Sequence, residues 1–590
     1  MDNRTLANVL YETADLLEVA NEDPFRIRSY RRAAEALEAH SQQVAPFICE
    51  NNDKAVLAIP GIGKGMLANL KELCSTGKLQ LHADLLTKYQ PAMLDLLKIS
   101  GLGPKTIALI WDTYHVCDPA GVQKLAEEGK IRTLPRMGEK AEQKILKGIA
   151  SFLSTTGRYH LDEADTIAQK MIAHLTGFPG VDKITPAGSF RRGRDTVGDL
   201  DILVTGKGCE ENSPKLEAIK DKVLAFPGIL EVLVRGDNKV SFKLRSGMQV
   251  DVRLLPPASF GAAMQYFTGS KNHNVTLRQR ALKMGFTLNE YGLFVLEDGK
   301  DEKGKNVAGK FVAGKTEEEV YKKLGLPYIP PEMRENCGEI DAAAEGKLPD
   351  LITQDDIQGD VHMHTIATDG KNTIEEMARA AKERGYKYMA ITDHSKNLAF
   401  ANGLDDARAL EHIRKIRAVS VPGIKIFAGI EVDILTDGEL DLSDSVLAEM
   451  DLVIASIHSH FQQEPAKITD RLLRVLDNKY VSIVGHPTGR MLLRREGYKF
   501  DMDKILDRAA KNKVAMEHNA YPDRLDLNDV HLRMARERGV KIVINTDAHH
   551  TTHMEKIKYG ILQARRAWLT KKDVLNTLPV AAFAKAMKRA

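Results

Sequence analysis

The sequence predicts a multidomain protein that combines α/β and α+β parts, with helical segments first and a β/α barrel last. Its 590 residues are too many for one hydrophobic core. Two apolar runs in the middle of the chain carry isolated carboxylates, and seven apolar runs near its end are followed by metal-binding side chains. We expect six consecutive parts, at residues 1–85, 86–150, 151–257, 258–326, 327–358 and 359–590.

Two glycine-rich turns in the helical part each precede an amphipathic run. Gly61 and Gly63 stand in the first turn, and Gly101 and Gly103 stand in the second. One such turn is more often a plain helix cap. Two matching copies favour helix-hairpin-helix motifs, in which exposed amides at a helix N-terminus bind one DNA phosphate without reading sequence. Residues 134–138 form a weaker third copy.

A basic helix precedes the first of these turns. Residues 25–34 contain four arginines together with Tyr30. An aromatic side chain among cationic groups can bind a terminal phosphate. We therefore expect Tyr30 to contact a 5′-phosphate in gapped DNA.

Three carboxylates mark the central part of the chain. Residues two apart in a strand share a face, so Asp199 and Asp201 point the same way. Asp251 lies in a second apolar run and needs only an adjacent strand to join them. Clustered carboxylates repel unless cations lie between them, and two Mg²⁺ ions about 3.5–4 Å apart suit an in-line phosphoryl transfer. This grouping is typical of a nucleotidyltransferase.

A phosphate-binding loop is expected directly before these strands. Gly188 and Gly198 let the backbone approach a triphosphate, Ser189 offers a hydroxyl, and Arg192 offers a fork of donors. The alternative interpretation is a polar strand end with surface arginines. The loop and the carboxylates together favour nucleotide binding.

The segment after Asp251 supports a specific resemblance. Tyr266, Phe267 and Gly269 are followed by Asn274 and Arg278, and then by the run at 285–291. With the preceding motifs, residues 1–330 resemble the family X DNA polymerases, the polymerase beta group. The resemblance implies a nucleotidyltransferase palm and a thumb, with primer-template or gapped DNA, deoxynucleoside triphosphates and Mg²⁺ as ligands.

The resemblance also implies residue roles. Asp199, Asp201 and Asp251 would bind metal and catalyse transfer, with Asp251 taking the proton of the primer 3′-hydroxyl. The incoming triphosphate would be bound by Gly188, Ser189, Arg192 and Gly198. The sugar would be contacted by Tyr266, Phe267 and Gly269. Asn274 would contact the base edge, and Arg278 would contact the template. Taken alone, the two aromatics would more often be core residues and Arg278 a solvated helix charge, but their order after the carboxylates favours the nucleotide and template roles.

One position departs from the family pattern. The beta group removes a 5′-deoxyribose phosphate through a Schiff-base lysine, and Asn69 occupies that position here. An amide cannot form the imine. Lys64 and Lys71 lie close by, so the sequence leaves lyase activity open.

From Gly359 onward, short apolar runs alternate with helix-like segments and end in imidazole or carboxylate side chains. Seven strands with polar groups at one end predict a β/α barrel whose site lies at the C-terminal mouth. The pattern resembles the PHP domain, the polymerase and histidinol phosphatase domain, a distorted seven-stranded barrel. The implied metal ligands are His362, His364, Asp369, His394, Glu431, His458, His486, Asp547 and His549.

The donor set indicates which metals to expect. Imidazole-rich sites without thiolates suit Mn²⁺, Zn²⁺ or iron better than Mg²⁺. We expect Mn²⁺ or Zn²⁺ in the barrel, up to three ions, and phosphoester hydrolysis, with Arg524 and Asn519 as phosphate contacts. A lone histidine after an apolar run is usually a core residue, the interpretation given to His412, His518, His531 and His553.

Composition agrees with a DNA-acting enzyme of the cytoplasm. The N-terminus has no apolar signal segment, no window approaches a membrane span, and the 5 cysteines show no paired spacing. The net charge of +3 is low for a DNA-binding protein. Clustered carboxylates would mask a basic groove that contains Arg191 and Lys271. We expect a monomer associated with the nucleoid and no membrane partner.

The sequence therefore predicts a DNA polymerase that fills short gaps in base excision repair and carries a 3′→5′ exonuclease in its barrel. Two alternatives remain open. In the first, the barrel is the only enzyme and the N-terminal half serves DNA binding. In the second, the protein is a non-catalytic scaffold for DNA ends.

Overall fold

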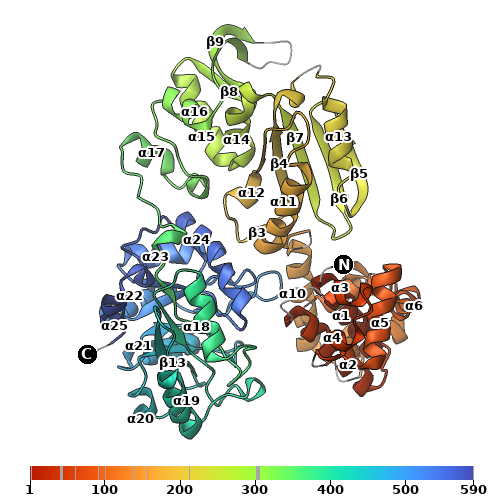
Figure 1. Ribbon diagram of the computed structural model, residues 1–590, viewed down its shortest axis with the longest axis vertical. Helices are drawn as coiled ribbons and strands as arrows, with labels where there is room; N and C mark the ends of the chain where they lie inside the picture. Colours follow the sequence, from red (N-terminus) through yellow and green to blue (C-terminus); the bar gives the residue numbers. More distant parts are fainter. Residues whose placement is uncertain are drawn as a thin grey trace. The chain divides into compact units, whose positions relative to one another are not determined.

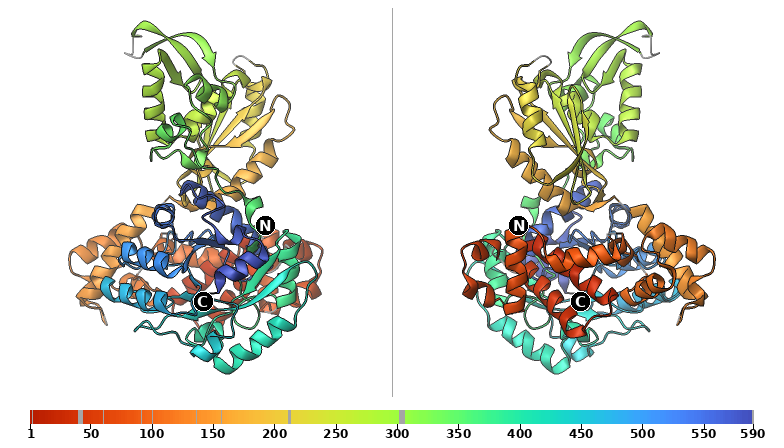
Figure 2. Two further views of the ribbon diagram at one scale, coloured as in Figure 1. Left: turned by 90° about the vertical axis from the view of Figure 1, so that its left-hand side faces the viewer. Right: turned by 90° about the vertical axis from the view of Figure 1, so that its right-hand side faces the viewer.

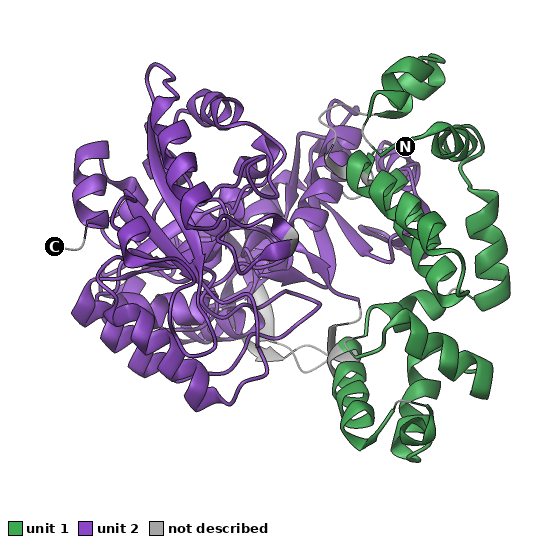
Figure 3. Cartoon of the chain, turned by 90° about the horizontal axis from the view of Figure 1, so that it is seen from below, with its two compact units in different colours: residues 1–156 green, residues 157–590 purple. Residues whose placement is uncertain are grey.

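The computed structural model describes residues 1, 3–39, 44–59, 61–90, 92–99, 101–135, 137–155, 157–210, 213–300 and 306–588 (Figure 1). The chain divides into two compact units, residues 1–156 and residues 157–590, which Figure 3 distinguishes by colour. In the described residues, no helix is both long and apolar enough to cross a membrane.

The first unit is helical throughout its described residues (Figure 3). Leu6, Leu10 and Leu17 recur at helical spacing in the first helix and are buried, so its apolar face packs against the other helices. The elements are α1 (Asn3–Val19), α2 (Pro24–Ala39), α3 (Val44–Cys49), α4 (Asp53–Leu57), α5 (Lys64–Thr76), α6 (Gln80–Tyr89), α7 (Met93–Leu97), α8 (Pro104–Tyr114), α9 (Pro119–Glu127), η1 (Ile131–Thr133) and α10 (Glu139–Thr155).

The second unit begins with a five-stranded sheet in the order β2-β4-β7-β6-β5. Its strands are β2 (Lys183–Pro186), β4 (Asp199–Thr205), β5 (Ile229–Arg235), β6 (Lys239–Leu244) and β7 (Gln249–Leu255), and β1 (Tyr159–His160) pairs with β3 (Thr196–Val197). Helices α11 (Leu161–Leu175) and α13 (Leu216–Leu224) bury their apolar residues against this sheet, and α12 (Gly188–Arg191) and η2 (Lys207–Cys209) are short (Figure 1). Only β4 and β7 pair in parallel, which brings the two carboxylate-bearing strands together.

A smaller α+β region follows the sheet. Its elements are η3 (Pro257–Ser259), α14 (Phe260–Thr268), α15 (Lys271–Lys283), β8 (Phe286–Asn289), β9 (Gly292–Lys300), β10 (Asn306–Ala313) and α16 (Glu317–Lys323). The three strands form an antiparallel sheet, drawn in green in Figure 2. A Cβ on Gly261 would lie 2.2 Å from the Thr316 backbone, so only glycine permits this close contact between α14 and the start of α16.

The segment between the two halves is a packed strap. It contains η4 (Pro331–Met333), α17 (Glu339–Ala344) and η5 (Gln354–Asp356). Arg334 is fully buried, and its Nη1 lies 2.6 Å from Glu317 Oε1. Its guanidinium also faces the ring of Tyr321. A buried charge with these partners anchors the strap to the region before it.

Residues 359 onward form the predicted seven-stranded parallel barrel, which confirms this part of the expected fold. The strands lie in chain order and are β11 (Gly359–Asp360), β12 (Tyr388–Ile391), β13 (Lys425–Asp433), β14 (Leu452–Ser456), β15 (Ile483–Val484), β16 (Ala515–Asn519) and β17 (Ile542–Asn545). A bridge between Met363 and Ala548 nearly closes the ring. The strands are buried on both faces, as a barrel filled inside and covered by helices requires.

Helices cover the outside of the barrel (Figure 1). They are α18 (Ile374–Glu383), η6 (Ala399–Ala401), α19 (Asp406–Ala418), α20 (Asp444–Leu447), α21 (Pro465–Asp477), α22 (Met502–Asn512), α23 (Asp529–Glu537), η7 (Thr551–Lys556), α24 (Ile557–Arg566), η8 (Leu575–Thr577) and α25 (Val580–Met587). Phe583 of α25 stacks on Tyr388 of β12, with ring centroids 4.6 Å apart. This final helix therefore packs against the barrel core.

Candidate functional site

The three central carboxylates lie on neighbouring strands, as the sequence pattern predicted. Asp201 on β4 stands opposite Asp251 on β7 in the parallel register. Asp199 is two residues before Asp201 and shares its face of the strand, while Leu200 is fully buried on the other face. The strand alternation and one parallel pairing are enough to gather these side chains.

Electrostatics distinguish two of these carboxylates. Burial, together with the negative charges of Asp199 and Asp251, raises the pKa of Asp201 to about 7. Burial also opposes ionisation of Asp251, but hydrogen bonds, the strongest from Lys239, hold its pKa below the usual value. Lys239 Nζ lies 2.7 Å from Asp251 Oδ2. The donor set is all carboxylate and fits Mg²⁺, which prefers oxygen ligands.

The glycine loop passes directly over the carboxylates. Gly188 has a φ of +61°, and a Cβ there would lie 2.3 Å from Asp201 Oδ2. Ser189 follows in α12, and Gly198 immediately precedes β4. The backbone therefore comes as close to the carboxylates as a residue without a side chain allows.

Two of the arginines in this loop, Arg191 and Arg192, have protein partners. Arg192 Nε donates to Glu335 Oε1 at 2.9 Å, and its Nη1 donates to the Thr268 carbonyl at 2.6 Å. Arg191, predicted to line a basic groove, forms an ion pair with Glu317 at 2.5 Å. Arg192 thus lies between the strap and the end of α14.

The residues expected around the sugar and the base lie at the junction of α14 and α15. The rings of Tyr266 and Phe267 contact each other edge to face with centroids 5.1 Å apart, and Gly269 ends α14. Asn274 is buried, and its Nδ2 donates to the Tyr266 carbonyl at 2.7 Å. Arg278 Nε donates to the Asn274 carbonyl at 3.3 Å. These contacts fix the junction between the two helices.

The two helix-hairpin-helix turns have matching geometry. Gly61 and Gly101 both have a φ of +97°, in the left-handed region that favours glycine. Gly63 and Gly103 are the N-caps of α5 and α8, and among the described residues nothing lies within 4 Å of a Cβ built on either. Both helix N-termini are therefore open to a phosphate. Pro60, Ser100 and Arg136 of these motifs lie outside the described residues.

Tyr30, expected at a 5′-phosphate, is a core residue of the first unit with 5% of its surface exposed. Its hydroxyl accepts a hydrogen bond from Asn69 Nδ2 at 2.8 Å. Lys71, near the expected lyase position, pairs instead with Asp53 at 2.7 Å. The asparagine therefore serves the packing between α2 and α5.

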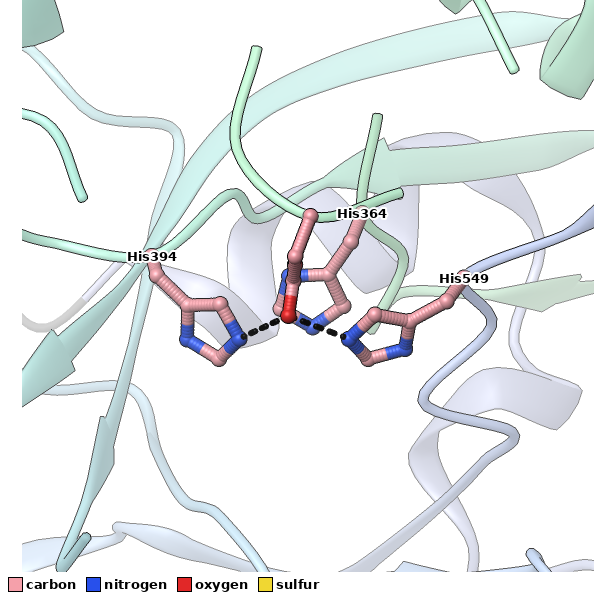
Figure 4. Close-up of side chains that lie close together, drawn as sticks. His364, His394 and His549 are labelled. Atoms are coloured by element: carbon pink, nitrogen blue, oxygen red, sulfur yellow. Dashed lines mark ion pairs between the residues drawn. The ribbon is translucent and has the colours of Figure 1, made fainter. Parts of the chain in front are cut away.

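The barrel brings all nine predicted metal ligands to one end. Figure 4 shows the rings of His364, His394 and His549 close together. The Asp369 carboxylate lies within ion-pair distance of all three. Asp369 Oδ2 is 3.5 Å from His394 Nε2 and 3.3 Å from His549 Nε2. Two further groups of mutually close ligand atoms are His362, His364 and Asp547, and His394, Glu431 and His458. His486 joins through its Nε2, 3.0 Å from Glu431 Oε1.

Buried polar atoms in this cluster lack hydrogen bonds. Within the described residues, the buried atoms without a partner include His362 Nε2, His364 Nδ1, His394 Nδ1, His486 Nδ1 and both carboxylate oxygens of Glu431. Buried polar groups are normally paired. Nitrogen and carboxylate donors left free and facing one another fit transition-metal ions at this position.

The charges within the cluster support the same conclusion. Burial opposes ionisation of Glu431, but nearby imidazoles, first that of His458, hold its pKa well below the ordinary value. Burial, together with the neighbouring imidazoles of His549 and His394, lowers the pKa of His364 to about 4. Burial opposes protonation of His394, but the charges of Glu431 and Asp369 raise its pKa to about 10. A metal ion bound at this carboxylate-rich cluster would therefore replace protons, because metal binding requires neutral imidazoles.

The sequence interpretation missed several side chains that orient these ligands. Glu517 Oε1 lies 2.6 Å from His362 Nδ1, and Asp433 Oδ1 lies 3.2 Å from His458 Nδ1. Carboxylates on the second imidazole nitrogen fix the tautomer of a metal-binding histidine. Glu517 directly follows an apolar run in the sequence, as several predicted ligands do, so its position could have identified it.

The expected phosphate contacts of the barrel lie beside one ligand. Asn519 Nδ2 donates to Asp547 Oδ2 at 3.0 Å, and Arg524 Nε lies 3.7 Å from the same oxygen. His412 and His518, expected to be core residues, are buried and bonded to Asp393 and to the Gly560 carbonyl. The arginine adds positive charge at the edge of the metal cluster.

Comparisons with protein families match the parts of the chain in order. Residues 1–79 match a helix-hairpin-helix domain and residues 93–151 a SAM-like helix-hairpin-helix tandem. Residues 158–235 match the DNA polymerase beta palm and residues 263–335 the DNA polymerase beta thumb. Residues 360–521 match the PHP domain. The matches follow the chain from the first helices into the barrel.

Three relatives cover different parts of the chain. The DNA polymerase/3′-5′ exonuclease PolX of Bacillus subtilis is 38% identical over 98% of this chain and 97% of its own length. Rat DNA polymerase lambda is 28% identical over 53% of each protein. A probable phosphatase of a Thermoanaerobacter species is 29% identical over 37% of this chain and 89% of its own. The chain therefore belongs to the family X DNA polymerases that carry a C-terminal PHP domain.

Proposed function

We propose that the protein is a DNA-directed DNA polymerase that fills short gaps in base excision repair, and that its barrel is a metal-dependent 3′→5′ exonuclease. The observation that carries the proposal is the register of Asp201 opposite Asp251, with Gly188 lying directly over Asp201. The name of the Bacillus subtilis relative, which matches nearly the whole chain, states both activities for that protein. We retain the six predicted segments as the division of labour along the chain.

In the polymerase site, Asp199, Asp201 and Asp251 hold Mg²⁺, and Asp251 takes the proton of the primer 3′-hydroxyl. The bound ions supply positive charge to the triphosphate and the attacking oxygen. Gly188, Ser189, Arg192 and Gly198 bind the triphosphate of the incoming deoxynucleotide. Arg192 Nε and one hydrogen of its Nη1 already donate to Glu335 and Thr268, so its remaining N–H groups are the donors for the triphosphate.

Around the nucleotide, the backbone at Gly269 and the rings of Tyr266 and Phe267 exclude a 2′-hydroxyl by close packing. Asn274 contacts the base edge and Arg278 the template strand. In the first unit, Gly61, Gly63, Gly101 and Gly103 bind DNA phosphates, and the basic face around Tyr30 receives the 5′-phosphate side of a gap.

In the barrel, the nine predicted ligands hold Mn²⁺ or Zn²⁺, up to three ions, which supply Lewis acidity toward a phosphodiester. Arg524 and Asn519 bind the phosphate. Gapped or primer-template DNA and deoxynucleoside triphosphates are the substrates. We place the protein in the cytoplasm at the nucleoid, because its DNA substrate is there. We expect it to act as a monomer.

The test follows an end-labelled primer in a one-nucleotide gapped duplex with a 5′-phosphate, in Mn²⁺. With all four deoxynucleotides the primer lengthens, and without them it shortens. Asp251→Asn abolishes lengthening and keeps shortening, whereas His364→Ala does the reverse. Equal lengthening by Asp251→Asn and the unaltered protein would reject the polymerase assignment. Shortening alone, in every arm, would make the barrel the only enzyme.

A further inference from the structure

Helix α24 of the barrel supports the loop that precedes β4. Gln563 Nε2 donates to the Gly193 carbonyl at 2.5 Å, and Arg566 Nη1 donates to the Arg192 carbonyl at 2.8 Å. A Cβ on Gly193, whose φ is +64°, would lie 2.9 Å from Leu562 Cβ. The loop backbone therefore rests directly on the barrel helix.

Arg566 is a buried charge with a complete set of partners. It is 3% exposed, and its Nη2 donates to Asp529 Oδ2 at 2.7 Å. Its Nη1 also donates to Glu335 Oε1 at 2.8 Å, the same oxygen that accepts from Arg192 Nε at 2.9 Å. Arg566 is thus connected to Arg192 in two ways: it donates to the Arg192 carbonyl, and both side chains donate to Glu335. A buried guanidinium is stable only in such a network.

A second contact holds the far end of the same loop. Arg490 Nη1 lies 3.2 Å from Asp195 Oδ2. The remaining donors of Arg490 are bonded to the carbonyls of Arg524 and Leu525, so its position is set by the barrel. Leu525 itself is part of the apolar core of the palm. Barrel side chains therefore hold the C-terminal part of the loop, at residues 192–193 and again at Asp195.

We propose that Arg566 and Gln563 are positioning residues of the polymerase site, through which the barrel sets the geometry of the triphosphate-binding loop. This rests on the proposed function, because it takes residues 188–194 as the triphosphate loop. A preorganised loop binds a charged ligand without an entropy cost for ordering its backbone, whereas a mobile loop bears that cost and binds the same ligand more weakly. The barrel then contributes to nucleotide selection from outside the palm and thumb.

The test compares Arg566→Met with Arg566→Lys and Gln563→Leu in the full-length protein, by single-nucleotide insertion into gapped DNA. We expect Arg566→Met to raise the KM for the deoxynucleotide about tenfold, the scale of one lost charged hydrogen bond. The affinity for gapped DNA and the exonuclease rate stay unchanged. The lysine variant recovers part of the KM effect, and Gln563→Leu gives a smaller increase.

Arg565→Met is the matched control. Arg565 is the preceding residue of α24, and its Nε donates to Glu332 Oε1 at 2.7 Å, away from the loop. Both variants remove one ion pair between the barrel and the strap, but only Arg566 contacts Arg192. An equal effect of the two variants on KM would reject positioning in favour of general contact between the two parts. An unchanged KM in Arg566→Met would also reject it.

Hydrogen exchange of the loop amides provides a readout that needs no polymerase activity. We expect faster exchange over residues 188–194 in Arg566→Met, and unchanged exchange there in Arg565→Met. If the unaltered protein extends no primer while the loop exchanges faster, the proposed function fails and the structural coupling stands. If the loop amides are unchanged in Arg566→Met, the coupling itself is wrong.

Discussion

The palm and the barrel gather their ligands in different ways. In the palm, carboxylates come from two adjacent strands, and Lys239 already lies 2.7 Å from one of them. In the barrel, side chains from successive strand ends converge, and both oxygens of the buried Glu431 face imidazoles, those of His394 and His486. Among the described residues, the groups with mutually close ligand atoms are in the barrel. The ring of barrel strands brings the ligand atoms of its metal site close together, whereas the strand pair of the palm brings its carboxylates to one face but leaves one of them paired with a lysine.

The largest expected effect separates the two sites. Asp251→Asn removes the proposed base and a metal ligand of the palm, and should lower primer extension by about 10²–10⁴-fold. Exonuclease activity should be retained, because the barrel ligands are untouched. Single-turnover insertion into gapped DNA measures the loss. Asp237→Asn, an exposed carboxylate in the same region, is the control and should be active.

The next effect tests preassembly in the barrel. Glu517→Gln weakens the acceptor that faces His362 Nδ1, and should reduce metal affinity by about 10–100-fold. Metal content after dialysis and the rate of primer shortening both report it. The exposed Glu375, changed to Gln, should have no effect. Retention of metal by Glu517→Gln would show that the ring of strands alone holds the ligands.

A smaller effect tests the partly assembled palm site. Lys239→Met removes a positive charge from Asp251, so Mg²⁺ should half-saturate primer extension at a several-fold lower concentration. Lys243 lies on the same strand and is exposed, which makes Lys243→Met the matched control. A higher Mg²⁺ requirement in Lys239→Met would mean that the ammonium serves the substrate instead of competing with the ion.

The smallest effect concerns the contact that joins palm and barrel. Asp165 Oδ2 accepts hydrogen bonds from Lys558 Nζ and the Tyr559 hydroxyl. Burial opposes its ionisation, but these bonds outweigh burial and hold its pKa below the usual value. Asp165→Asn should therefore lower the free energy of unfolding at pH 7 by about 2 kcal/mol.

The sign of the pH dependence follows from the lowered pKa of Asp165. Its contribution is complete above the unfolded pKa and is lost as pH falls through the folded pKa. Denaturant unfolding should therefore show the difference between Asp165→Asn and the unaltered protein shrinking below about pH 5. A difference that grows in acid would contradict this assignment.

Much of both sites could be predicted from local pattern. The two-residue spacing of Asp199 and Asp201 requires only a strand, and most barrel ligands lie at or just after the end of an apolar run. The matching glycines at 61 and 101 likewise require only a tight turn. These features depend on residues close together in the chain, which is why the sequence shows them.

Partners far apart in the chain could not be predicted in this way. Tyr30 reads as an exposed aromatic in a basic helix, yet it is buried and bonded to Asn69. Glu335 belongs to the expected segment 327–358 and stands in no motif, yet it joins Arg192 to Arg566. No local pattern indicates which distant side chain will satisfy a buried polar group.

The sequence by itself determined the order of the parts, the strand that carries Asp199 and Asp201, and the nine side chains at the barrel mouth, because spacing and alternation are local properties. Only the tertiary structure decided that Asp251 stands opposite Asp201, that Lys239 pairs with Asp251, and that α24 packs against the loop at Arg192 and Gly193. These depend on which surfaces pack together, and burial leaves each charged group one set of partners.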